Sequence, residues 1–70
     1  MDMKNIGERI KEIRKENGLS QQAFGKVLAV SQDTVSLWEN GKSLPTAEFL
    51  IAIAQTFHIS VDYILCLKEY

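Results

Sequence analysis

Residues 19–45 read LSQQAFGKVLAVSQDTVSLWENGKSLP, and this stretch decides the fold that we expect for the 70-residue chain. Ser20 and Ser31 are each suited to cap a short helix, because a serine hydroxyl can accept a hydrogen bond from a free backbone N–H. Only about three residues, 28–30, separate the two helices, and a connection this short sets helices at a steep angle. The stretch therefore predicts a helix-turn-helix unit over about residues 20–40.

The second helix of this unit, expected from Ser31 to about Asn40, has two different sides. Val35 and Trp38 share the side of the cap, which we expect to face the core. The other side carries Gln32, Asp33, Ser36, Leu37 and Asn40. In a major groove, glutamine can pair with adenine, aspartate can accept from cytosine, and leucine can meet a thymine methyl. The pattern alone fits DNA reading and an ordinary solvated helix face equally well.

Helical periodicity also occurs N-terminal to the unit and within it. Ile6, Ile10 and Ile13 recur at helical spacing and predict an amphipathic helix that ends near Asn17. The first helix of the unit is expected to bury one apolar stripe, composed of Ala23, Phe24, Val27 and Leu28.

C-terminal to the unit, a helix starting at Thr46 is apolar on nearly all sides, which indicates central burial or a partner. Ser60 is a fitting N-cap for a fifth helix, with Asp62 in its first turn. No stretch of useful length alternates polar and apolar residues as a strand does. We therefore expect an all-α fold, in which residues 1–70 form a single compact five-helix domain.

Composition argues against several classes of protein. The chain has a net charge of −1, one cysteine (Cys66) and one histidine (His58). A lone cysteine forms no internal disulfide, so we expect an intracellular, cytoplasmic protein. No residue pattern fits a catalytic set, a metal site, a cofactor or a small-molecule ligand, so we do not expect an enzyme. The longest apolar run, residues 49–54, is far too short to span a membrane.

Residues across the chain resemble the Cro and phage-repressor (XRE) helix-turn-helix family. The resemblance rests on Leu19-Ser20-Gln21-Gln22, Val30-Ser31-Gln32, Trp38-Glu39-Asn40-Gly41-Lys42 with Pro45, and the tail Phe57-His58-Ile59-Ser60-Val61-Asp62-Tyr63-Ile64-Leu65. It covers roughly residues 6–65 and implies a lambda-repressor-like DNA-binding domain. The implied function is sequence-specific regulation of transcription on double-stranded DNA, expected to be repression.

The resemblance assigns a role to individual residues. Base contacts are implied for Gln32, Asp33, Ser36 and Leu37. Contacts with DNA phosphates are implied for Gln21, Thr34, Asn40, Lys42 and Ser43. Gln21 is also expected to brace Gln32. Arg14 and Glu39 match a pair that forms an internal salt bridge, so Arg14 is expected to be structural.

Several positions depart from the family pattern, among them Leu37 and Asp33, which replace the polar or basic residues common at the reading positions. Ala29 stands where the family has glycine in the turn, so a positive φ there would strain the backbone by about 1 kcal/mol. Gly25 stands where a small residue, usually alanine, lets two helices approach. Asp33 would repel DNA phosphates unless it meets a cytosine amino group. Asp33 and the near-neutral charge leave one alternative open, a protein-interaction module (an antirepressor or antitoxin-type partner) with little DNA binding.

A second copy of the chain is the partner that we expect besides DNA. A stripe of three residues lies at positions that are commonly polar in the family and would join residues of the tail in a homodimer interface. The candidate interface consists of Phe49, Ala52, Thr56, Tyr63, Leu67 and Tyr70. A two-fold dimer would place two reading helices about 34 Å apart, one turn of DNA, and so predicts a two-fold symmetric operator.

Overall fold

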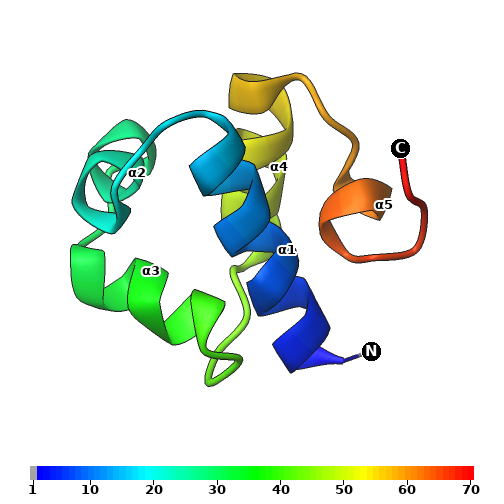
Figure 1. Ribbon diagram of the computed structural model, residues 1–70, viewed down its shortest axis with the longest axis horizontal. Coiled ribbons are helices and arrows are strands. Elements are labelled where there is room, and N and C mark those ends of the chain that lie inside the picture. Colours follow the sequence, from blue (N-terminus) through cyan, green and yellow to red (C-terminus); the bar gives the residue numbers. More distant parts are fainter. Residues whose placement is uncertain (1) are drawn as a thin grey trace.

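The computed structural model describes residues 2–70, which form five helices and no strand (Figure 1). The helices are α1 (Met3–Glu16), α2 (Gln21–Leu28), α3 (Gln32–Glu39), α4 (Ala47–Phe57) and α5 (Val61–Ile64). The predicted all-α, five-helix fold is confirmed. Among residues 2–70, every helix is too short or too polar to cross a membrane.

Side-chain caps fix where four of the helices begin. The Oγ atoms of Ser20, Ser31 and Ser60 accept hydrogen bonds from the backbone N–H three residues on, at 3.0, 3.2 and 3.0 Å. These three predicted caps are confirmed. Asp2 caps α1 by accepting from the N–H of Lys4 at 2.9 Å. Thr46 stands at the N-cap position of α4, but its side chain makes no capping bond.

All five helices contribute to one hydrophobic core. Ile6, Ile10 and Ile13 of α1 are buried, as predicted from their spacing. The remaining buried apolar side chains are Phe24, Leu28, Val35, Trp38, Ile53 and Ile64. The rings of Phe24 and Phe57 stack with their centroids 5.5 Å apart, which joins α2 to α4. The core therefore holds the helix-turn-helix unit against α1 on one side and α4 on another.

One expectation about burial is wrong. Val27 was expected in the buried stripe of α2, but its side chain is 50% exposed, and the buried flank carries Gly25 instead. A Cβ atom on Gly25 would lie 2.6 Å from the carbonyl oxygen of Val30, so the close approach at Gly25 is made by the backbone of the turn. Packing of this turn therefore places Gly25, and not Val27, beside the buried Phe24 and Leu28.

Of the two alternatives expected for α4, central burial does not apply, and a partner for its exposed side stays a prediction. Ile53 is its one fully buried residue, while Ile51 is 50% exposed. Several other apolar residues of α4 are half-buried at the edge of the core: Phe49, Leu50, Ala52, Ala54 and Phe57. One side of α4 therefore faces the core and the opposite side faces solvent.

The C-terminal ends of the helices share one backbone motif. Each helix is followed by a residue with positive φ: Gly18, Ala29, Gly41, His58 and Cys66. The N–H of the next residue then bonds to a carbonyl five residues back, as Val30 does to Gly25 at 2.9 Å. Ala29 has φ 61° and ψ 39°, so the turn between α2 and α3 does require the left-handed conformation at an alanine.

Candidate nucleic-acid interface

Helix α3 is anchored on one side and exposed on the other. It packs against α1 and α2, which together cover its inner side (Figure 1). Val35 and Trp38 are completely or almost completely buried there, and the ring of Phe49 packs against Trp38 with centroids 5.7 Å apart. This packing fixes the rotation of α3 about its axis and therefore the direction of its outward side chains.

The outward side of α3 carries the residues that the helical wheel predicts. Gln32 and Asp33 are exposed, Leu37 is 45% exposed and Ser36 is half-buried. Asn40, at the C-cap, donates through Nδ2 to the backbone oxygen of Ser36 at 2.9 Å and to its Oγ at 3.2 Å. The predicted division of α3 into a core side and an outer side is confirmed.

Asp33 also has a structural reason for its position. It lies in the first turn of α3, where the free N–H groups give the helix a partial positive charge. A carboxylate there stabilises the helix whether or not it meets a base. From the sequence, we expected Asp33 either to contact a cytosine amino group or to repel phosphates, but not to have this role in stabilising the helix.

The candidate phosphate-binding residues surround the two ends of α3. At its N-terminus, Thr34 Oγ1 lies 3.0 Å from the Oγ of Ser31. Beyond its C-terminus, Lys42 is exposed and Ser43 is half-buried. Gln21 makes a different contact from the one expected, because its Nε2 donates to Oε1 of Glu39 at 3.2 Å. In this structure Gln21 therefore braces Glu39, whereas the resemblance implied that it braces Gln32.

A buried ion pair joins α1 to α3. Arg14 Nε lies 2.7 Å from Oε2 of Glu39, and Arg14 Nη2 lies 3.1 Å from Oε1. Arg14 also donates to the backbone oxygen of Leu19 at 2.9 Å, which ties down the start of the loop before α2. The hydrogen bond with Glu39 raises the pKa of Arg14 above its usual value despite burial. Arg14 therefore has the structural role expected for it, because it links α1 to α3.

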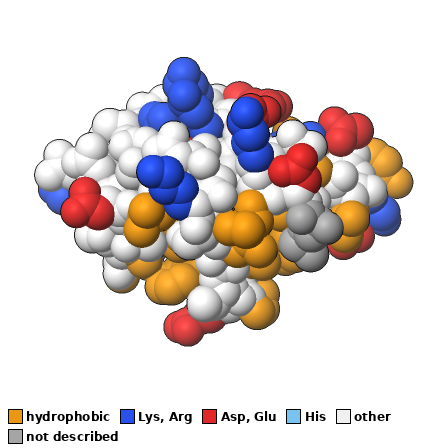
Figure 2. Space-filling model, turned by 90° about the horizontal axis from the view of Figure 1, so that it is seen from below, with side chains coloured by type: hydrophobic (Ala, Val, Ile, Leu, Met, Phe, Trp, Pro, Cys, Tyr) orange, Lys and Arg blue, Asp and Glu red, His pale blue; other side chains and the backbone are white. Residues whose placement is uncertain are grey.

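Lys4 joins the candidate interface although its position in the sequence gives no hint of it. A Cβ atom on Gly41 would lie 2.9 Å from the Cα of Lys4, so the start of α1 touches the turn that carries Lys42. Both lysines are exposed. Figure 2 shows Lys and Arg side chains above a central group of hydrophobic side chains on the face seen from below. This neighbourhood adds positive charge beside the C-terminal end of α3.

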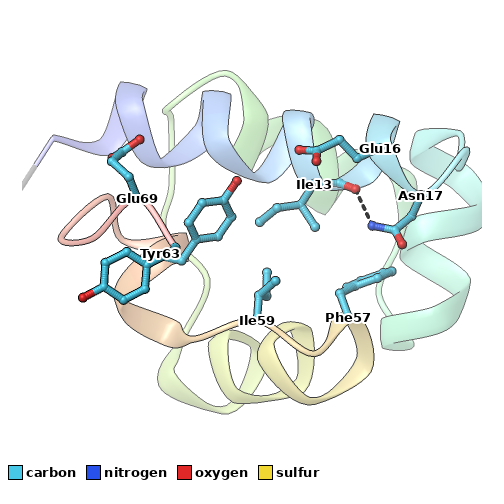
Figure 3. A pocket seen from close by; sticks show the side chains of 8 residues that line it. Ile13, Glu16, Asn17, Phe57, Ile59, Tyr63 and Glu69 are labelled. Carbon is cyan, nitrogen blue, oxygen red and sulfur yellow. Dashed lines mark hydrogen bonds between the residues drawn. The ribbon is translucent and has the colours of Figure 1, made fainter.

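The predicted dimer residues fall into two separate groups. On α4, Phe49 and Ala52 are half-buried against the core and Thr56 is exposed. In the C-terminal region, Tyr63 and Tyr70 line a groove whose other lining residues include Ile13 of α1 and Phe57 of α4 (Figure 3). Leu67 is 65% exposed.

Arg9, which the sequence did not single out, organises the C-terminal region. Its Nη1 donates to the backbone oxygen of Tyr63 at 2.6 Å, and its guanidinium lies 4.1 Å from the centre of the Tyr63 ring. Its Nη2 lies 3.0 Å from Oε1 of Glu69. One side chain of α1 therefore fixes both α5 and the tail.

Comparison with known proteins identifies the family. Residues 10–64 match the helix-turn-helix family along most of the chain. The chain belongs to the helix-turn-helix family. The resemblance to phage repressors is confirmed as well, because this helix-turn-helix domain is 37% identical over 65 residues to the repressor protein C2 of Salmonella phage P22.

Two further comparisons define the extent of the similarity. The domain is 40% identical over 67 residues to the HTH-type transcriptional regulator DicA of Escherichia coli. A crystal structure of the P22 c2 repressor in complex with a synthetic operator superimposes with a TM-score of 0.78, covering 84% of this chain and 89% of that one. Although 93% of this chain is matched in both curated relatives, it spans only 30% of the length of the P22 repressor and 50% of DicA.

Proposed function

We propose that the domain binds double-stranded DNA sequence-specifically and acts in the cytoplasm as a transcriptional repressor. The observation that carries this proposal is the rigid presentation of α3, whose inner side is locked by Val35, Trp38 and the Arg14–Glu39 pair. Its outer side is free and rich in hydrogen-bonding groups, which suits insertion into a major groove. The P22 repressor, which shares this fold, was crystallised on operator DNA, and this supports the proposal.

Different parts of the surface take different roles in this proposal. Base edges meet the outward side of α3, through Gln32, Asp33, Ser36 and Leu37. The DNA backbone meets the flanks of the helix, through Thr34, Asn40, Lys42, Ser43 and the added Lys4. The net charge of the chain is −1, so hydrogen bonds from amides and hydroxyls carry more of the affinity than lysines do.

We further propose that two copies of the domain bind a two-fold symmetric operator. A two-fold axis would place two α3 helices on successive major grooves, about 34 Å apart. The α4 group of candidate residues, Phe49, Ala52 and Thr56, lies on the edge of the core and remains our candidate for the contact between copies. Tyr63 and Tyr70 line a groove with a different character, for which we propose another role below.

Selection of bound sites from a random pool of duplex DNA tests the proposal. We expect a two-fold symmetric consensus, and a Gln32→Ala variant should lose about 1–3 kcal/mol of discrimination at one position of each half-site. Gln55→Ala, an exposed glutamine on α4, is the matched control and should leave the consensus unchanged. A wild-type domain that dimerises but selects no sequence, even in low salt, would instead favour the interaction module.

A further inference from the structure

A groove separates the C-terminal half of α1 from α4, α5 and the C-terminal residues 65–70 (Figure 3). These last residues are called the tail below. Its floor is apolar and consists of Ile13, Phe57, Ile59 and Tyr63. Figure 3 shows Ile13 pointing from α1 toward Ile59, with Phe57 beside it. None of the lining residues belongs to α2 or α3, so the groove is separate from the proposed DNA-reading surface.

Two acidic residues border the groove, and one of them is already paired. Glu16 and Asn17 border it on α1, and Glu69 and Tyr70 border it on the tail. No lysine or arginine lines it. Among residues 2–70, the ion pairs join Arg9 to Glu69, Arg14 to Glu39 and Lys68 to Asp62, so the carboxylate of Glu16 is not neutralised by a partner.

The backbone adds negative potential to the same place. Glu16 is the last residue of α1, and α4 ends at Phe57. The C-terminal end of a helix carries a partial negative charge, and it attracts cations. Two helix ends and the unpaired carboxylate of Glu16 therefore border an apolar floor, whereas Glu69 is already paired with Arg9. This combination is complementary to two neighbouring side chains, one apolar and one positively charged.

The groove is large enough to take one or two side chains. Its volume is about 270 Å³. Pockets that bury a whole small molecule usually have about 300–1,000 Å³, so a space of this size suits one or two side chains. Tyr70, 83% exposed at the rim, offers the kind of aromatic surface that dominates many protein interfaces.

A second copy of the same chain is a poor occupant. In a two-fold dimer the same surface meets itself, so groove would face groove. No lysine or arginine lines the groove of a second copy, so this surface offers no counter-charge for Glu16. Two such grooves would bring two uncompensated carboxylates into one interface, which is unfavourable.

We propose that this groove binds a short segment of another protein in which an apolar side chain is flanked by lysine or arginine. The apolar side chain occupies the floor above Ile13 and Ile59, and the cation lies between Glu16 and the C-terminal end of α4. Such a site would let a partner protein bind the domain while α3 remains free.

The test uses a blocked peptide of alternating lysine and leucine, titrated into the isotope-labelled 70-residue chain and followed by NMR. We expect backbone shifts concentrated at Glu16, Asn17, Ile59 and Tyr63. Glu16→Gln should weaken binding about two- to fivefold, the size of one exposed charge contact. Glu48→Gln removes an equal charge at an exposed position of α4, outside the groove, and should leave the affinity for the peptide unchanged.

Three results would overturn the proposal. The first is equal binding of a peptide with glutamate in place of lysine, and the second is a set of shifts elsewhere or none at all. The third is a dimer in sedimentation experiments that Glu16→Gln dissociates, which would make the groove an interface between copies. Tyr70→Ala provides an independent variant, because this exposed residue can be removed without opening the core, and it should also weaken the peptide. Site selection on DNA should be unchanged in Glu16→Gln, so failure here leaves the proposed DNA binding standing.

Discussion

The Nε atom of Arg14 lies 2.7 Å from Oε2 of Glu39, and this contact links the first helix to the helix that we propose reads DNA. Both side chains are nearly inaccessible, with 11% and 3% of their surface exposed. Gln21 adds a third donor to the same carboxylate from α2. The position of α3 is therefore set by polar contacts as well as by the apolar packing of Trp38.

Removal of one partner of this pair should be strongly destabilising. Glu39→Ala leaves the Arg14 guanidinium buried without its counter-charge, and we expect the free energy of unfolding to fall by about 3–5 kcal/mol. Urea unfolding followed by the fluorescence of Trp38 measures the change. A double variant, Arg14→Met with Glu39→Leu, should lose less than Glu39→Ala alone, because no charge remains buried. A loss no larger than that of the exposed Glu8→Ala would contradict the structural role.

Gly7 controls how closely α1 and α3 can approach. A Cβ atom there would collide with the carbonyl oxygen of Trp38 and lie 2.8 Å from that of Glu39. Because backbone atoms cannot move aside, Gly7→Ala should destabilise the domain by roughly 1–3 kcal/mol, although alanine is the better helix former. Thermal unfolding measures this, with the exposed Asn5→Ala as a near-neutral control. A gain in stability would show that the two helices separate easily.

The helix starts were predictable because they depend on local chemistry. Ser20, Ser31 and Ser60 each satisfy a backbone N–H three residues away, and a sequence displays such a relation directly. The outward direction of Gln32 was equally predictable, since Val35 and Trp38 mark the opposite side of the same helix. Both the fold and the candidate reading surface therefore follow from short-range patterns and the family resemblance.

The features that escaped prediction depend on contacts between distant residues. Arg9 contacts Tyr63, which lies 54 positions further along the chain, and no sequence pattern near either residue indicates this contact. Lys4 reaches the interface only because the turn at Gly41 folds back onto α1. Val27 was misplaced because the turn backbone, and not side-chain hydrophobicity, occupies the buried flank of α2.

Ala29 should be a site where glycine stabilises the domain. Its φ of 61° lies in the left-handed region, which costs a residue with a Cβ atom roughly 1–2 kcal/mol. Ala29→Gly removes this strain but makes the unfolded chain more flexible, so we expect a net gain of about 1 kcal/mol. Ala23→Gly, the same substitution inside α2, should instead lose about 0.5–1 kcal/mol. Chemical denaturation measures the change in the free energy of unfolding, which should be a gain for Ala29→Gly and a loss for Ala23→Gly. A loss in both variants would contradict the expected relief of strain.

Lys4 and Lys42 should contribute to DNA affinity without affecting which sequence is chosen. Each lysine that neutralises a phosphate releases counterions, so Lys42→Ala should lower the slope of log affinity against log salt by about 1. Lys4→Ala should have an effect of similar size if its contact with the turn at Gly41 places it near the same backbone. Binding isotherms at several salt concentrations measure the slopes. Lys68→Ala, near the C-terminus and outside α3 and the turn at Gly41, is the control, and an equal effect there would indicate only a general loss of charge.

The ionisation of Tyr63 reports on the acidic groove. Burial raises the pKa of Tyr63 above its usual value of 10.0, Arg9 opposes this, and nearby carboxylates, including Glu16, raise it further. The folded domain thus holds the phenol proton more tightly than the unfolded chain does, so the stabilisation is complete below about pH 10 and is lost as pH rises through the folded pKa. A Tyr70→Phe variant leaves Tyr63 as the single tyrosine, and its absorbance titration should have a midpoint above 10.0. Glu16→Gln should lower that midpoint, whereas Glu48→Gln should not. If the Glu16→Gln variant has the same Tyr63 midpoint as the protein with Glu16, this carboxylate does not face the groove.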